Sequence, residues 1–204
     1  VVLVNWREYN ASVKDGEYII QYTVGDDKDV SGQKTRCVLL LAVELWNQTQ
    51  GYDSYDVFLS GTEKIGRIVK LACEHVEKRA AVFAKNHKDD KVIYTMGSGS
   101  GYGAAYMESI CIFMEMQWIN SSSIHTGEFF HGPFEITDAN IPFVIQISEG
   151  PNRPLDERTL KFLKTYGKRI EVLDAKELGL STIDATVVDY FNHSLFNNVY
   201  PVYN

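Results

Sequence analysis

The segment that decides the fold class is residues 91–101, which read KVIYTMGSGSG. A short apolar run from Lys91 to Met96 is typical of a buried strand, and the glycines and serines after it are typical of a tight turn. The following residues, from about Tyr102 to Met116, are apolar nearly all round, which predicts a buried helix. A strand that passes through a glycine-rich turn into a helix is the unit from which doubly wound α/β sheets are built.

The serines of this turn, Ser98 and Ser100, are candidate ligand-binding residues. Glycines let the backbone approach a ligand closely, and serine hydroxyls together with helix amides can hold an anion. The turn lacks the full spacing of a dinucleotide fingerprint and the lysine of a nucleotide P-loop. A plain strand-to-helix turn with a serine cap is therefore an equal alternative.

Strand and helix patterns alternate after this unit. We expect strands at about Ile119–Ile124, Pro142–Ser148 and Arg169–Leu173, and helices at about Thr126–His131, Leu155–Gly167 and Ile183–Phe196. Alternation at this spacing predicts a mostly parallel sheet with right-handed crossovers, covered by helices on both faces. The predicted fold class is α/β: a doubly wound, flavodoxin-like sandwich of three layers.

The first ninety residues have a different pattern. We expect short strands at Val1–Val4 and Tyr18–Val24, followed by long helices at about Asp29–Gln50 and Thr62–Asn86. The chain therefore divides into residues 1–50, linking helices over 51–90, and an α/β domain over 91–204.

Composition and charge exclude several classes of function. The 204 residues are 45% hydrophobic and 23% charged, with a net charge of −7, which is ordinary for a globular protein. An acidic chain without a basic run is a poor candidate for binding nucleic acid or an anionic membrane, and no apolar stretch has membrane-spanning length. The cysteines (Cys37, Cys73 and Cys111) are scattered in apolar, helical surroundings, which predicts buried, reduced thiols and a cytoplasmic location.

Ionisable side chains interrupt the apolar stretch from Met114 to Glu135. They are Glu115, His125, Glu128, His131 and Glu135. Ionisable groups in such surroundings need partners, and a carboxylate there tends to have a raised pKa. We expect a helix, a short strand and a Gly-Pro turn to bring them into one cleft. A core does not require this chemistry, so the stretch predicts a catalytic site.

Two pairs of ionisable residues in this stretch and just before it have informative spacings. Glu108 and Glu115 are seven positions apart, which is two turns of an α-helix, so both are expected on one face. His131 follows Glu115 by 16 positions and suits proton transfer, while Glu128, one turn before it, is placed to orient it. The alternatives are structural ion pairs for Glu108 and Glu115 and a hydrogen-bonded core histidine for His131. No spacing indicates a metal site or a redox cofactor, and we expect neither.

At these residues the sequence resembles the sugar-isomerase (SIS) domain family, and in particular its fructosamine 6-phosphate deglycases. The likeness lies in residues 114–120, in the run GEFFHGPFE at 127–135 and in RPLDER at 153–158. The resemblance implies that Glu115 is the general base and that His131 assists ring opening and proton transfer. It also implies two tandem SIS domains, with the end of a first domain in residues 1–50 and a second in 91–204.

The function that the resemblance implies is cleavage of a fructosamine 6-phosphate, such as fructoselysine 6-phosphate, to glucose 6-phosphate and an amine. We expect a homodimer or higher homo-oligomer, with His131 serving either its own subunit or a neighbour. We also expect the chain to be a piece of a longer protein, inactive without the phosphate-binding loops of the first domain. The alternatives are a ketose/aldose phosphate isomerase or aminotransferase-type enzyme, and a non-catalytic sugar-phosphate-binding module.

Overall fold

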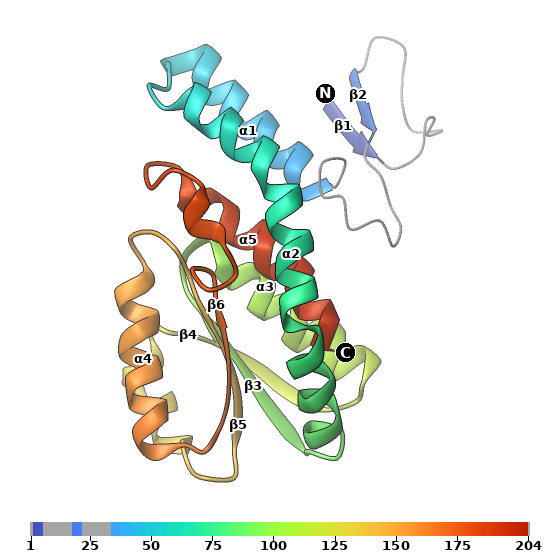
Figure 1. The fold of residues 1–204 in the computed structure, drawn as a ribbon, viewed down its shortest axis with the longest axis vertical. Helices are drawn as coiled ribbons and strands as arrows, with labels where there is room; N and C mark the ends of the chain where they lie inside the picture. Colours follow the sequence, from blue (N-terminus) through green and yellow to red (C-terminus); the bar gives the residue numbers. More distant parts are fainter. Residues whose placement is uncertain (1, 6–17, 22–33, 204) are drawn as a thin grey trace.

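The computed structural model of the chain describes residues 2–5, 18–21 and 34–203 (Figure 1). Its centre is a four-stranded parallel sheet in the order β4-β3-β5-β6. The strands are β3 (Val92–Gly97), β4 (Asn120–His125), β5 (Pro142–Ile147) and β6 (Arg169–Asp174). This arrangement confirms the predicted α/β class and the parallel sheet.

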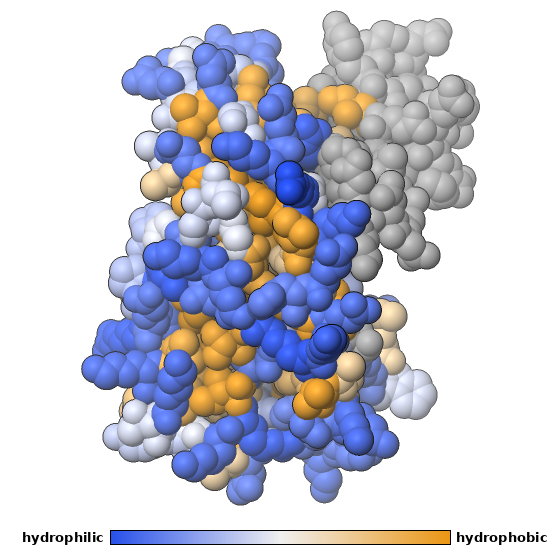
Figure 2. Space-filling view, in the orientation of Figure 1, coloured by the Kyte–Doolittle hydropathy of each residue, from blue (hydrophilic) through white to orange (hydrophobic). Residues whose placement is uncertain are grey.

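Helices cover both faces of the sheet (Figure 1). One face packs against α2 (Tyr55–His87), α3 (Tyr102–Met107) and α5 (Asn192–Val199), and the other against α4 (Arg153–Tyr166). Helix α1 (Lys34–Gln50) and the first turns of α2 extend beyond the end of the sheet as a two-helix arm. Apolar side chains remain exposed on this arm, and apolar patches interrupt an otherwise hydrophilic face (Figure 2).

Two hydrophobic cores lie on the two faces of β5, a strand that is buried along its whole length. Val144 faces α2, α3 and α5, whereas Phe143 and Ile145 face α4. Because neighbouring side chains of a strand point to opposite faces, a strand covered on both sides is apolar at nearly every position, and β5 has one polar residue, Gln146. This two-sided burial explains the nearly continuous apolar run in the sequence.

The helix α2 begins at Tyr55, seven residues before the predicted start. The amide of Phe58 donates to the carbonyl oxygen of Ser54 (2.8 Å), and the Phe58 ring is fully buried against Phe191. Gly61 sits inside the helix because a Cβ there would lie 2.7 Å from the Phe191 ring. A glycine at this position is thus required by close packing.

The predicted helix from Ile183 to Phe196 is wrong in its first half. Residues Val188–Phe191 form a 3-10 helix, and the α-helix α5 starts at Asn192. The side-chain amide of Asn192 donates to the carbonyl oxygens of Glu149 (2.7 Å) and Asp189 (3.1 Å), and its Oδ1 accepts from the Glu149 amide (2.9 Å). This buried amide links the start of α5 to the end of β5.

The predicted helix from Tyr102 to Met116 changes type midway. It is α-helical to Met107 and becomes a π-helix over Glu108–Met116. Its i→i+5 bonds place more residues in each turn than the 3.6 of an α-helix, so seven residues no longer complete two turns. The prediction that Glu108 and Glu115 share one face is therefore wrong: Glu108 is fully buried and Glu115 is exposed.

Near the amino terminus, β1 (Val2–Asn5) and β2 (Tyr18–Gln21) form a separate parallel pair. Residues 6–17 and 22–33 lie outside the described residues, and so does the first part of the helix predicted from Asp29. No disulfide joins the three cysteines, of which Cys73 is buried while the other two are partly exposed. The prediction of buried thiols therefore holds for Cys73 alone.

Candidate active site

Glu115 lies in the last turn of the π-helix with its side chain exposed to solvent. Large apolar residues around it are exposed as well: Met114, Met116, and Trp118 with 89% of its surface exposed. Trp118 has a positive φ of 59°, which costs a residue other than glycine roughly 1–2 kcal/mol. The carboxylate is thus open to a ligand, within an apolar surface of the kind that marks an interaction site.

His131 ends a short 3-10 helix, Phe129–His131, which a three-residue turn connects to the end of β4. Phe129 is fully buried and anchors this turn on the core, while the His131 imidazole is exposed. The His131 amide donates to the carbonyl oxygen of Glu128 (2.9 Å). The link between these two residues is through the backbone, so the predicted orientation of the imidazole by the Glu128 carboxylate is not present in this structure.

Glu115 and His131 belong to elements on opposite faces of the sheet. Phe113, in the helix of Glu115, is part of the core with α2, α3 and α5, whereas Phe129 is part of the core with α4. The sequence predicted one cleft for both residues. Within a single chain the structure does not bring them together, because the edge strand β4 lies between the two elements. The other central histidine, His125, has a local role, with its Nδ1 accepting from the Gly127 amide (3.1 Å).

Glu108 is the strongly perturbed acid of this region. Its two carboxyl oxygens are buried without a hydrogen-bond partner, and burial raises its pKa from 4.5 to about 8. Burial also raises the pKa of Tyr200, and the nearby Glu108 carboxyl raises it further. Glu108 is therefore a neutral acid at pH 7. Its assignment as a supporting residue stays a prediction, since it has no exposed surface.

The carboxyl ends of three strands converge on a residue that the sequence reasoning missed, Asp156. Its Oδ1 accepts from the hydroxyls of Ser98 and Thr126 (2.7 Å each), and its Oδ2 accepts from the Ser148 amide (2.9 Å). Ser98, Thr126 and Ser148 directly follow β3, β4 and β5. A hydroxyl residue directly after each of three strands was a signal available in the sequence.

The fourth strand is tied to the same helical turn by Arg153. Its guanidinium makes two hydrogen bonds to Asp174, the last residue of β6 (2.9 and 2.8 Å), and further ones to Glu149 (3.2 Å) and Glu157 (2.7 Å). Burial alone would raise the pKa of Asp174, but the bonds from Arg153 hold it below its usual range. The first turn of α4 thus holds the ends of all four strands.

Ser100, the second predicted ligand-binding serine, donates its hydroxyl to the carbonyl oxygen of Asp189. It lines a cavity of about 470 Å³ between α1, the glycine-rich turn and the start of α5. The imidazole of His193 lines the same cavity, and partial burial lowers its pKa. Ser98, in contrast, is fully buried, and its binding to a ligand stays a prediction that this geometry does not favour.

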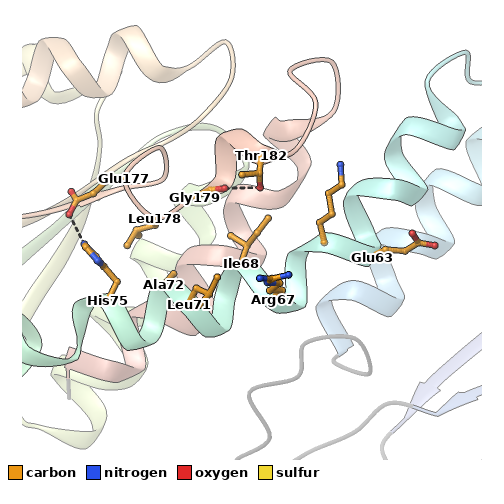
Figure 3. A pocket seen from close by; sticks show the side chains of 11 residues that line it. Glu63, Arg67, Ile68, Leu71, Ala72, His75, Glu177, Leu178, Gly179 and Thr182 are labelled. Carbon is orange, nitrogen blue, oxygen red and sulfur yellow. Dashed lines mark hydrogen bonds and ion pairs between the residues drawn. The ribbon is translucent and has the colours of Figure 1, made fainter.

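A groove of about 660 Å³ lies between α2 and residues 177–182 (Figure 3), and none of the predicted site residues lines it. Its floor is apolar, with Leu71 and Leu178, and one end is closed by the hydrogen bond between His75 Nε2 and Glu177 Oε1 (3.0 Å). Among the described residues, no group of histidine, cysteine and acidic side chains has a geometry suited to a metal ion. Within the same part of the chain, no helix is long and apolar enough to span a membrane.

No family model matches the chain. Fructosamine deglycase FrlB of Bacillus subtilis (strain 168) is 35% identical to it over 198 residues, which are 97% of this chain and 60% of that protein. A crystal structure of a protein from Salmonella typhimurium LT2, assigned as a phosphosugar isomerase, superposes with a TM-score of 0.93 and 42% identity over 100% of this chain and 64% of that one. The chain belongs to the sugar-isomerase (SIS) domain family.

A second named SIS relative matches a shorter part of the chain. Fructoselysine 6-phosphate deglycase of Escherichia coli (strain K12) is 33% identical over 87 residues, which are 43% of this chain and 26% of that enzyme. The chain therefore spans 60% of the length of the Bacillus subtilis relative and less of the Escherichia coli one. Both named relatives are deglycases, so the family membership supports an enzyme of phosphosugar chemistry.

Proposed function

We propose that the protein carrying this chain is a deglycase of a fructosamine 6-phosphate, such as fructoselysine 6-phosphate. The observation that carries the proposal is the 35% identity over 97% of the chain to a fructosamine deglycase. The exposed carboxylate of Glu115 supports it, since a base that removes a carbon-bound proton must be accessible to the substrate.

The proposed reaction has two stages. Glu115 takes a proton from C1 of the amino-ketose, giving an enaminol, and protonation at C2 then gives an imine at C1. Water adds to this imine, and the C–N bond breaks with proton transfer to nitrogen, releasing the amine and the aldehyde of glucose 6-phosphate. His131 is proposed to move the ring-oxygen proton when the cyclic sugar opens.

We further propose that the working unit is a homodimer or higher homo-oligomer. Glu115 and His131 lie against opposite faces of the sheet of one chain, and the surface around Glu115 is apolar and exposed. In a homo-oligomer, His131 of a second copy can approach Glu115 of the first. Light scattering of the purified protein tests this arrangement, and a monomer with full activity would contradict it.

Turnover of the Glu115→Gln variant tests the main proposal. With fructoselysine 6-phosphate as substrate, glucose 6-phosphate release should fall by roughly 10²–10⁴-fold, since Gln keeps the shape and removes the base. Glu77→Gln, an exposed change on α2, is the matched control and should retain full activity. Near-normal turnover of Glu115→Gln would rule out the assigned base.

A second comparison separates the deglycase from an isomerase. The wild-type protein should release an amine from fructoselysine 6-phosphate and should not convert fructose 6-phosphate into an aldose phosphate. The reverse result would favour the isomerase alternative, and no turnover of either would favour a binding module. His131→Ala should slow ring-closed substrates more than open-chain ones, and equal losses would indicate a structural histidine.

A further inference from the structure

The buried carboxylate of Asp156 lies where doubly wound sheets bind their ligands. Such sheets bind in the crevice at the carboxyl ends of the strands, at the point where the strand order reverses. Here the connection from β3 leads to β4 on one side, and the next strand, β5, lies on the other side of β3. Asp156 accepts hydrogen bonds from the residues that directly follow these three strands. Its carboxylate therefore occupies the switch point itself.

The donors around Asp156 have the character of an oxyanion site. Two hydroxyls, from Ser98 and Thr126, and one backbone amide, from Ser148, meet the two carboxylate oxygens at 2.7–2.9 Å. Hydroxyls and backbone amides are the groups that hold phosphate at strand-to-helix turns. Asp156 itself is in the first turn of α4, where the helix dipole favours a negative charge.

A second buried polar group lies close to the glycine-rich turn. The side-chain amide of Gln146 is fully buried with both polar atoms unpartnered, and it lies beneath the glycine-rich turn. A Cβ on Gly97 would be 2.3 Å from its Nε2, and one on Gly101 would be 2.9 Å away. Among the described residues, this side-chain amide has no hydrogen-bond partner.

In the part of the chain that the structure describes, the surroundings of Asp156 leave no space for an external anion and offer it no unpaired cationic side chain. Asp156 has no exposed surface, and the Ser148 hydroxyl is used by the carbonyl oxygen of Ser98 (3.3 Å). The guanidinium of Arg153, one turn earlier, is taken up by Asp174 and by carboxylates of its own helix. A phosphate brought here would also be repelled by the Asp156 charge.

We propose that Asp156 is an internal substitute for a bound phosphate. Its carboxylate closes the switch point of this SIS domain to phosphorylated sugars, so the substrate's phosphate is bound outside this crevice. Removal of the Asp156 side chain should therefore open an oxyanion site. The proposal rests on the proposed function only for the identity of the excluded ligand, a sugar phosphate. The donor geometry stands without it.

The test compares wild type, Asp156→Ala and Asp156→Asn in inorganic phosphate and in chloride at equal ionic strength. The alanine variant removes both the charge and the bulk, whereas the asparagine variant removes the charge and keeps the crevice filled. At a phosphate concentration ten times the dissociation constant, Asp156→Ala should gain roughly 3–6 °C in Tm. In NMR spectra of Asp156→Ala, the backbone amide resonances of Ser98, Thr126 and Ser148 should shift when phosphate is added. Wild type and Asp156→Asn should show neither effect.

Each outcome decides for or against the proposal. Phosphate-dependent folding of an otherwise unfolded Asp156→Ala chain would support it, because phosphate then replaces the carboxylate. Failure to fold in either buffer, or folding without a phosphate response, would overturn it. Phosphate-induced shifts of these amides in wild type would overturn it as well. Turnover is not a readout, so failure here is distinguishable from failure of the Glu115 test.

Discussion

The neutral, buried carboxyl of Glu108 should make the stability of the protein depend on pH in a way that one substitution removes. The perturbation is Glu108→Gln, which keeps size and shape but cannot ionise. Burial raises the folded-state pKa to about 8, against 4.5 for an exposed glutamate. The folded chain therefore keeps a proton that the unfolded chain releases above pH 4.5. Stability from this group is full below pH 4.5 and is lost as the pH rises to about 8.

The magnitude follows from the gap between these two pKa values. At about 1.36 kcal/mol per pKa unit, the free energy of unfolding falls by roughly 4–5 kcal/mol as the pH rises from 4.5 to about 8. Between pH 6 and pH 8 the variant should gain about 2.3 kcal/mol on wild type, because the pH dependence flattens as the pH approaches the folded-state pKa of about 8. This corresponds to a difference of roughly 5–10 °C in Tm for a chain of this size.

The assay is urea unfolding of both proteins, followed by circular dichroism at half-unit steps from pH 5 to pH 9. Glu115→Gln is the matched control, since it makes the same change on the same helix at an exposed side chain and should run parallel to wild type. A wild-type profile parallel to that of Glu108→Gln would contradict a buried, protonated Glu108. It would mean that the Glu108 carboxyl finds a partner or water in solution.

The remaining predictions concern stability and are measured by the same urea unfolding. Asp156→Asn should cost roughly 2–4 kcal/mol, because its new amide leaves buried groups such as the Ser148 N–H without an acceptor; Asp89→Asn, at an 89% exposed side chain, should change nothing measurable. Gly99→Ala should cost about 1–3 kcal/mol, since φ is +58° and its Cβ would lie 2.4 Å from a neighbouring amide nitrogen. Trp118→Gly should stabilise by about 0.5–1 kcal/mol, because little packing is lost and the positive φ is relieved. A loss for Trp118→Gly, or no loss for Gly99→Ala, would show that the backbone there is not strained as described.

The α/β class and the parallel sheet could be predicted from the sequence because they follow from local pattern. The run from Val92 to Gly97 forms β3, and β5, apolar apart from Gln146, has the pattern of a strand covered on both faces. Element ends were predicted less well where packing set them. Gly61 stays helical because the Phe191 ring, 130 positions later, fills the space of its missing side chain.

For the site residues, the sequence could identify which side chains are able to transfer protons, but not which way each side chain points. Glu108 and Glu115 were recognised as unusual, and spacing alone placed them on one face. The change from α-helix to π-helix at Glu108 separates them, and no residue pattern announces that change. In the same way, the sequence spacing of Glu115 and His131 does not reveal that β4 lies between the elements that carry them.

By itself, the sequence determined the family, the parallel α/β architecture and the residue types able to move a proton, because these depend on periodicity and motif. The tertiary structure alone decided that Glu108 is a buried neutral acid, that Glu115 is open, and that Asp156 fills the switch point. Burial, and with it the pKa and availability of a side chain, arises from contacts between segments far apart in the chain. The sequence alone does not indicate whether a carboxylate lies in solvent, in an apolar core or against the hydroxyls at the ends of three strands.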